Sequence, residues 1–270
     1  MTNKRAFITG GSRGIGRGII GQLADAGYDI AFTYNSQIDE AESLKAELTA
    51  LGLRVFFYQA SLQLPDVAET VTQQAINDLG GIDLLVCNAG LTRHNDLLNL
   101  QGDLIDFVYN LNYRSYMLCA KVAAGDMVAR QYKGNIIFIA STRGIRAYPE
   151  DAVYGGMKAA LIRSVESMAL DMAPHGIRVN CVAPGATATR GGYTDAELSS
   201  GTFPPRIPLG RKGKPEEVGA LVRFIASDAA AYMTGNTIKL DGGLILPGMP
   251  EREHRPGTPP APPSAPPTSP

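Results

Sequence analysis

Three residues in the middle of the chain have the types and spacing needed to move a proton at a carbonyl oxygen. Ser141 follows an apolar run, residues 136–139, that is typical of a buried strand. Tyr154 and Lys158 stand four apart in a segment predicted to be helical, residues 152–173, so their side chains share one helix face. A lysine ammonium near a phenol favours the phenolate, because opposite charge stabilises the ionised form. A serine hydroxyl can hold a carbonyl oxygen where the phenol can protonate it.

The order and spacing of these residues resemble the Ser and Tyr-x-x-x-Lys signature of the short-chain dehydrogenase/reductase family. A tyrosine and a lysine four apart recur by chance in many helices, so the resemblance depends on further motifs in the family's order. These are Thr9-Gly10-Gly11-Ser12-Arg13-Gly14-Ile15-Gly16, similar to the cofactor loop; Cys87-Asn88-Ala89-Gly90, similar to Asn-Asn-Ala-Gly; and Pro184-Gly185-Ala186-Thr187-Ala188-Thr189, similar to the Pro-Gly segment. The family implies an oxidoreductase.

The glycine-rich loop has a physical reason to bind a dinucleotide. Gly10, Gly14 and Gly16 follow the first predicted strand, where they permit tight turns and let a pyrophosphate approach the start of the next helix. A second glycine pattern, residues 16–21, matches the generic dinucleotide fingerprint, but it falls inside the predicted helix instead of at the turn. We therefore assign the first pattern to the cofactor.

The resemblance implies a role for each residue that matches a family motif. Tyr154 would be the general acid/base, Ser141 would orient and polarise the oxygen, and Lys158 would lower the pKa of Tyr154 and hold the nicotinamide ribose. Asn112 would complete a proton relay by holding a water that links Lys158 to solvent. Asn88 has a structural alternative, since it could tie its strand to a neighbour. The implied cofactor contacts are Gly10, Ser12, Arg13, Gly14, Ile15, Gly16, Asn35, Ser36, Asn88, Ala89, Gly90, Tyr154, Lys158, Pro184, Gly185, Thr187 and Thr189.

The choice between NAD and NADP depends on the end of the second predicted strand. An enzyme for NAD usually places an acid there to hold the ribose 2′-hydroxyl. Here the strand ends in Thr33-Tyr34-Asn35-Ser36, and the first acid, Asp39, comes too late. Arg13 lies in the glycine loop, and a guanidinium suits a 2′-phosphate by charge and geometry. We therefore predict NADP(H), with NAD the less favoured cofactor.

Strand and helix patterns alternate along the chain. Helical patterns of 10–15 residues separate the strands, which predicts a parallel sheet with helices on both faces. We expect an α/β fold, a single doubly wound Rossmann domain with a parallel seven-stranded sheet. The predicted strands are residues 4–9, 29–34, 53–58, 82–87, 136–139, 177–183 and 236–240, and the helices include 39–51, 65–79, 104–131 and 152–173.

The end of the chain differs in composition from the rest. Residues 1–246 form the predicted catalytic domain, whereas residues 247–270 hold ten of the eighteen prolines and almost no apolar side chains. Such a segment cannot bury a core, so we expect it to be disordered or polyproline II-like. A role in docking an aromatic groove is the less favoured alternative.

Composition excludes several other classes of protein. A net charge of −1 gives no reason to expect nucleic acid or an anionic membrane as a partner. Three separated cysteines indicate free thiols in a reducing compartment, and three scattered histidines do not predict a metal site. There is no signal-peptide pattern and no apolar run long enough to span a bilayer, so we expect a cytoplasmic protein.

The substrate is the least determined part of the prediction. Thr92, Arg143 and Arg190 follow predicted strands, at the edge where ligands bind in open α/β sheets. Such a polar mouth favours a sugar, a polyol or a small oxo compound over a steroid. A 3-oxoacyl-[acyl-carrier-protein] reductase is an alternative, and a non-catalytic NADP(H)-sensing protein is one from another class. Residues 207–211 and 234–243 resemble those of tetrameric family members, which predicts a homotetramer by analogy.

Overall fold

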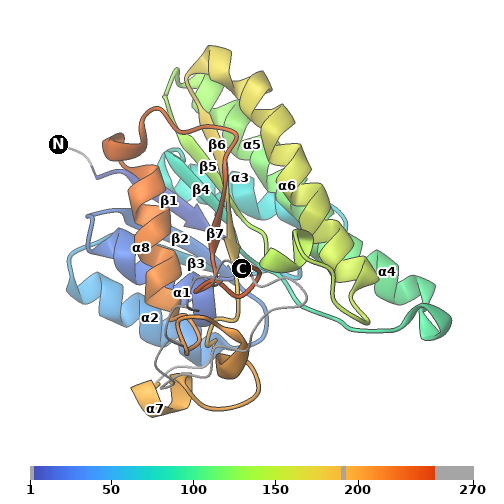
Figure 1. Ribbon diagram of the computed structural model, residues 1–270. Helices are drawn as coiled ribbons and strands as arrows, with labels where there is room; N and C mark the ends of the chain where they lie inside the picture. Colours follow the sequence, from blue (N-terminus) through green and yellow to red (C-terminus); the bar gives the residue numbers. More distant parts are fainter. Residues whose placement is uncertain (1–2, 190–192, 247–270) are drawn as a thin grey trace, which may run out of the picture.

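The computed structural model describes residues 3–189 and 193–246 and contains one parallel sheet. Its seven strands are ordered β3-β2-β1-β4-β5-β6-β7, which confirms the predicted doubly wound fold (Figure 1). Each strand begins and ends within two residues of its predicted bounds. The strands are β1 (Arg5–Ile8), β2 (Asp29–Tyr34), β3 (Val55–Gln59), β4 (Leu84–Cys87), β5 (Asn135–Ile139), β6 (Arg178–Pro184) and β7 (Thr237–Leu240).

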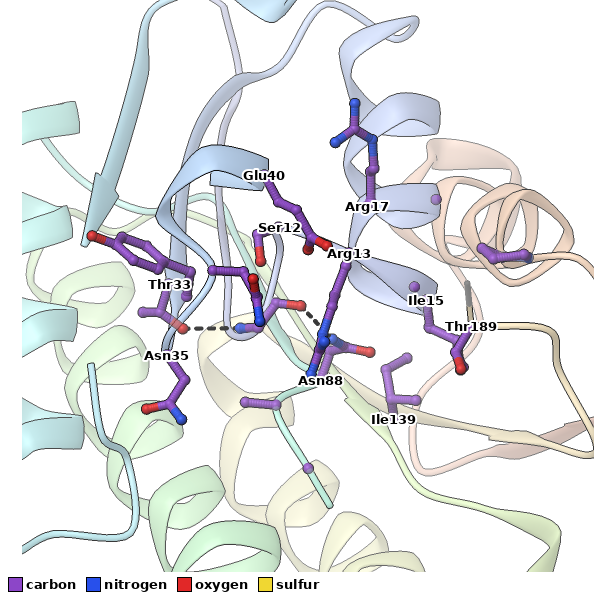
Figure 2. A pocket seen from close by; sticks show the side chains of 18 of the residues that line it. Ser12, Arg13, Ile15, Arg17, Thr33, Asn35, Glu40, Asn88, Ile139 and Thr189 are labelled. Carbon is purple, nitrogen blue, oxygen red and sulfur yellow. Dashed lines mark hydrogen bonds between the residues drawn. The ribbon is translucent and has the colours of Figure 1, made fainter. Parts of the chain in front are cut away.

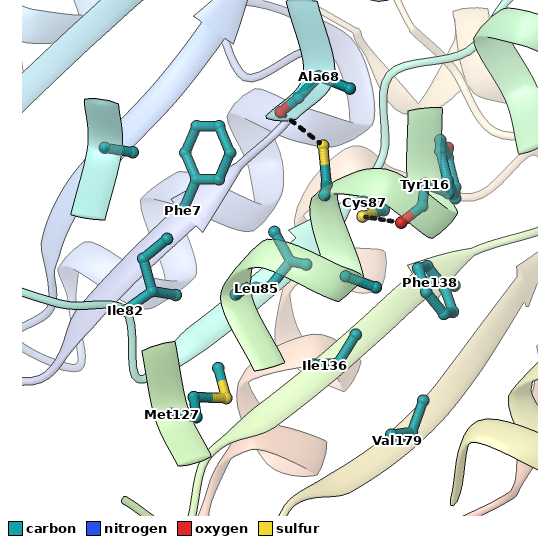
Figure 3. Packing of buried hydrophobic residues seen from close by; sticks show 14 of the residues in the cluster. Phe7, Ala68, Ile82, Leu85, Cys87, Tyr116, Met127, Ile136, Phe138 and Val179 are labelled. Atoms are coloured by element: carbon teal, nitrogen blue, oxygen red, sulfur yellow. Dashed lines mark hydrogen bonds between the residues drawn. The ribbon is translucent and has the colours of Figure 1, made fainter. Parts of the chain in front are cut away.

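Helices cover both faces of the sheet because its side chains alternate between two apolar cores. In β1, Phe7 faces one core, whereas Ala6 and Ile8 face the other. Helices α1 (Gly14–Ala24), α2 (Ile38–Ala50) and α8 (Pro215–Ala226) cover the second core. Helices α3 (Val67–Leu79), α5 (Ser115–Ala129) and α6 (Ala152–Met172) cover the first, which Figure 3 shows around Phe7, Leu85 and Phe138. Helices α4 (Gly102–Tyr109) and α7 (Asp195–Leu198) lie outside these two layers.

The strand order places a crevice at the centre of the sheet. The chain runs outward from β1 to β2 and β3, then returns to pair β4 with the other side of β1. Ligands bind at such a switch point, outside the carboxyl ends of the strands. The loops that follow β1, β4 and β5 therefore meet at one edge, and these loops carry the predicted motifs.

Two predicted helices have different bounds in the structure. Helix α3 begins at Val67 and not at Pro65, because Asp66 has a left-handed backbone with φ 62°. The predicted helix 104–131 is interrupted by a π-helical turn, Asn110–Arg114, between α4 and α5. Side chains in this turn and directly after it bond to carbonyls of the helix and compete with the regular ladder: Asn112 Nδ2 donates to Val108 O at 3.2 Å, and Ser115 Oγ to Leu111 O at 2.7 Å.

Two findings bear on the predicted cellular context. Cys87, Cys119 and Cys181 are all buried free thiols. Within residues 3–189 and 193–246, no helix has the length and hydropathy needed to cross a membrane. The proline-rich segment 247–270 lies outside the described residues, so its predicted disorder stays a prediction.

Candidate active site

A cavity of about 1540 Å³ opens at the carboxyl ends of the central strands (Figure 2). It is larger than the roughly 300–1,000 Å³ typical of small-ligand sites, in part because it continues along α1 and α2 as far as Asp25 and Leu51. Fourteen of the predicted residues line it: Gly10, Ser12, Arg13, Gly14, Ile15, Asn35, Ser36, Asn88, Ala89, Gly90, Thr92, Tyr154, Lys158 and Thr189. The structure thus brings the cofactor loop, the segment after β4 and the start of α6 to one place.

The glycine loop leaves the start of α1 open to an anion. A Cβ on Gly16 would lie 2.0 Å from Gly10 O and 2.8 Å from Asn88 Nδ2, so no larger residue fits there. The first turn of α1 has neither a side-chain cap nor an acidic residue, which leaves its free N–H groups available. These features fit the pyrophosphate of a dinucleotide.

Asn88 fastens β4 to the glycine loop. Its Nδ2 donates to Thr9 O at 3.1 Å and to Gly10 O at 2.9 Å, while its backbone N–H donates to Thr9 Oγ1 at 2.9 Å. Asn88 also lines the cavity. The structural reading of Asn88 is therefore correct, and it is compatible with a place beside the cofactor.

Lys158 is buried against the end of β5. Its Nζ donates to Ile139 O at 2.9 Å and lies 5.6 Å from the centre of the Tyr154 ring. Burial lowers the pKa of Lys158 to about 8, because desolvation disfavours the ammonium. The two side chains share one helix face, as the i,i+4 spacing predicted.

Tyr154 differs from the prediction in the direction of its pKa. We expected Lys158 to lower the pKa of the phenol, but burial raises it, and hydrogen bonding with the Thr92 and Ser141 side chains only partly offsets this effect. The predicted direction was wrong because desolvation of the phenolate outweighs these hydrogen bonds and the attraction to Arg143. Tyr154 therefore carries its proton at neutral pH and is suited to act as an acid.

Asn112 lies in the π turn and is fully buried. Its Nδ2 donates to Leu91 O at 3.2 Å and its Oδ1 accepts from Leu91 N at 3.3 Å, so it clamps the segment that leads to Thr92. A Cβ on Gly90 would lie 2.6 Å from Asn112 Oδ1 and 3.7 Å from Lys158 Nζ. Glycine is needed here for the three segments to meet, and the predicted relay role of Asn112 stays a prediction.

The three predicted substrate residues have different positions. Thr92 lines the cavity beside Tyr154. Arg143 does not line it: its Nη1 lies 3.1 Å from Asp151 Oδ2, and its guanidinium stacks on the Tyr148 ring at 4.8 Å. Nothing in the local sequence indicated that a buried Asp151 would neutralise this arginine. Arg190 lies outside the described residues.

Of the Pro-Gly segment, only Thr189 lines the cavity. Thr187 instead forms an isolated bridge with Gly213, and Thr187 Oγ1 donates to Gly185 O at 3.3 Å. Sequence reasoning also missed several lining residues, which are Arg17, Glu40, Leu91, Phe107, Leu111 and Tyr193. The sequence did contain a signal for Glu40, because it lies in the first turn of a helix that starts directly after the predicted cofactor residues Asn35 and Ser36.

Comparisons with other proteins agree with this geometry. Residues 10–245 match the family described as enoyl-(acyl carrier protein) reductase. The 3-oxoacyl-[acyl-carrier-protein] reductase of Staphylococcus aureus is 37% identical over 246 residues, which cover 90% of this chain and 98% of that protein. The L-rhamnose 1-dehydrogenase (NAD(P)(+)) of a Sphingomonas species is 31% identical over 91% of this chain and 98% of that protein.

Solved structures show the same architecture. An acetoin dehydrogenase from Salmonella typhimurium superposes with a TM-score of 0.88 at 31% identity, over 93% of this chain and 99% of that one. A short-chain dehydrogenase/reductase from Serratia marcescens superposes with a TM-score of 0.82 at 34% identity, over 89% of this chain and 97% of that one. On this evidence the chain belongs to the short-chain dehydrogenase/reductase family and is an NAD(P)-dependent oxidoreductase.

Proposed function

We propose that the protein reduces the carbonyl group of a small substrate with NADPH. The observation that carries this proposal is the place of the Tyr154 phenol, which lines the cavity beside the Thr92 and Ser141 hydroxyls and the buried Lys158, and whose pKa is raised by burial. A phenol that keeps its proton can donate it as a carbonyl becomes an alkoxide.

Each residue of the site has a separate task in this reaction. When bound, the dinucleotide supplies the hydride. The Ser141 and Thr92 hydroxyls hold the substrate oxygen beside Tyr154, whose phenol donates the proton. Lys158 binds the nicotinamide ribose and carries positive charge next to the phenol. Asn112 fixes the backbone of Leu91, and so the position of Thr92.

The proposed preference for NADP(H) is supported by Arg13. This residue lines the cavity and makes no ion pair with any residue in the ranges 3–189 and 193–246. Arg17, the neighbouring arginine on the cavity wall, is already paired with Glu47 at 2.6 Å. No acid stands at the end of β2, where an NAD enzyme commonly has one. Arg13 is thus available to a 2′-phosphate.

The substrate we propose first is a 3-oxoacyl thioester. Leu91, Phe107 and Leu111 line the cavity near Thr92, and Leu91 is 38% exposed there. Such an apolar wall suits an acyl chain. Arg143, which had favoured a polar substrate in the sequence analysis, is neutralised by Asp151 and no longer supports that expectation. The Staphylococcus aureus relative is named for a 3-oxoacyl substrate.

A sugar or polyol is the second candidate. It is favoured by the relative named for L-rhamnose and by the exposed hydroxyl of Thr92. One panel separates the candidates: NADPH oxidation with acetoacetyl thioesters, acetoin and ketoses, and NADP reduction with aldoses. We expect the highest kcat/KM with the thioester. A protein that binds NADPH but oxidises it with none of these would favour the non-catalytic alternative.

The expected homotetramer also stays a proposal. It is supported by residues 207–211 and 234–243, which resemble tetrameric members of the family. Sedimentation equilibrium of the full chain tests it, since a monomer would contradict the analogy. A cytoplasmic location stays a prediction as well.

A further inference from the structure

Four helices in the described part of the chain, α2, α3, α7 and α8, carry a glutamate at the third helical position. In a capping box such a glutamate accepts a hydrogen bond from the backbone N–H of the residue that precedes the helix. Glu197 does so in α7, where it accepts from Thr194 N at 2.7 Å. Glu217 does so in α8, where it accepts from Lys214 N at 2.7 Å.

Glu40 in α2 has the same position and makes no such bond. Its Oε2 atom is buried and has no hydrogen-bond partner within residues 3–189 and 193–246. A buried carboxylate oxygen without a partner is unfavourable, because its lost hydration is not replaced. Glu69 of α3 also forms no capping box, but it pairs with Lys121 at 2.8 Å, whereas Glu40 has no ion pair of this kind among the described residues and calls for another partner.

The orientation of Glu40 is toward the cavity. Figure 2 shows its side chain reaching from the start of α2 toward Ser12, whereas Arg13 extends toward Asn88, and Ser12, Arg13 and Glu40 all line the cavity. No ion pair joins Glu40 to either arginine of this wall, since Arg17 pairs with Glu47 and Arg13 has no carboxylate within 4.0 Å in the described residues. Opposite charges therefore face the cavity without neutralising each other.

We propose that Glu40 is a second determinant of cofactor choice, which accepts a hydrogen bond from an adenosine ribose hydroxyl and opposes Arg13. A carboxylate attracts a ribose hydroxyl and repels a 2′-phosphate, whereas a guanidinium attracts the phosphate. The site can then bind NAD(H) through Glu40 and NADP(H) through Arg13, and the ratio of the two affinities reflects their balance. This inference rests on the proposed dinucleotide site.

Calorimetric titration of the full chain with NADPH and with NADH, without substrate, tests the proposal directly. Glu40→Gln keeps the shape and removes the charge. We expect the Kd for NADH to rise about fivefold, as a charged hydrogen bond becomes a neutral one, and the Kd for NADPH to stay or fall. Asp39→Asn is the matched control, since it removes the same charge from the same helical turn at an exposed residue that does not line the cavity.

The outcomes separate this inference from the proposed function. The proposed role of Glu40 in cofactor choice is supported if the ratio of the two dissociation constants changes in Glu40→Gln but stays within about twofold of the wild-type ratio in Asp39→Asn. Equal weakening of both dinucleotides would show a structural role for Glu40 and overturn it, as would an equal change in the control. A wild-type protein that binds neither dinucleotide overturns the proposed function together with this inference.

Discussion

The nucleotide end of the cavity carries two charged side chains without a partner in the described part of the chain, whereas the charged side chains around the catalytic end are bonded within the protein. At the nucleotide end, Arg13 and Glu40 face the cavity and have no partner among the described residues. At the catalytic end, Lys158 donates to a backbone carbonyl, and Arg143, behind the cavity wall, is paired with Asp151. Unpaired charge marks where a ligand must supply the missing partner, whereas paired charge holds the protein's own loops in place.

The largest effect should come from the group that completes the catalytic end. Tyr154→Phe removes the proton donor and leaves the ring, so turnover should fall by about 10²–10⁴, while NADPH affinity stays near that of the wild type. Single-turnover NADPH oxidation and fluorescence titration measure the two properties separately. Reduction at the wild-type rate would remove Tyr154 from the mechanism.

The paired charges should matter more for stability than for catalysis. Arg143→Leu leaves the buried Asp151 carboxylate without its closest cation, which should lower the free energy of unfolding by about 2–4 kcal/mol. The matched control is Arg163→Leu, because Arg163 forms an exposed pair with Glu166, and it should change stability by less than about 1 kcal/mol. Urea denaturation measures both. Equal losses in the two variants would show that the buried pair has no special weight.

The pH dependence of activity should reflect the buried lysine. The pKa of Lys158 is lowered to about 8, so the ammonium is present below this pH and is lost above it. We therefore expect kcat/KM for reduction to fall as the pH rises through about 8, while Tyr154 keeps its proton because its own pKa is raised. In the Lys158→Arg variant the guanidinium keeps its charge to higher pH, so its affinity for NADPH should not weaken near pH 8. If its affinity for NADPH still falls near pH 8, the titrating group is not residue 158.

The smallest effect should come from the end of the chain. Residues 247–270 are proline-rich and hold no residue that we place in the site. Removing them should leave kcat/KM and the thermal midpoint unchanged within error. A loss of reductase activity in the shortened protein would instead support a working role for the tail.

Sequence patterns were sufficient for the sheet and for most of the catalytic end. Strand periodicity predicted all seven strands, because apolar runs separated by helical patterns have few other arrangements. The motifs also predicted that Thr92, Tyr154 and Lys158 lie at one site, and all three line the cavity. These features depend on local sequence, or on loops whose positions follow from the strand order.

The errors arose where distant residues decide the outcome. The contacts of Asn112 include bonds to Leu91, 21 residues away in the chain, which local sequence does not indicate. The neutralisation of Arg143 depends on how the loop before α6 buries Asp151. The raised pKa of Tyr154 depends on its depth in the folded protein, which side-chain spacing does not determine.

The most direct test of the comparison is the NADPH affinity of two arginine variants. Arg13 and Arg17 line the same cavity, but only Arg17 is already paired, with Glu47. We predict that Arg13→Ala lowers the affinity for NADPH about tenfold to hundredfold, as expected for a lost charged hydrogen bond, and leaves the affinity for NADH nearly unchanged. Arg17→Ala should lower the affinity for NADPH by less than about threefold. Equal losses in the two variants, or equal loss of affinity for NADPH and NADH in Arg13→Ala, would contradict this prediction.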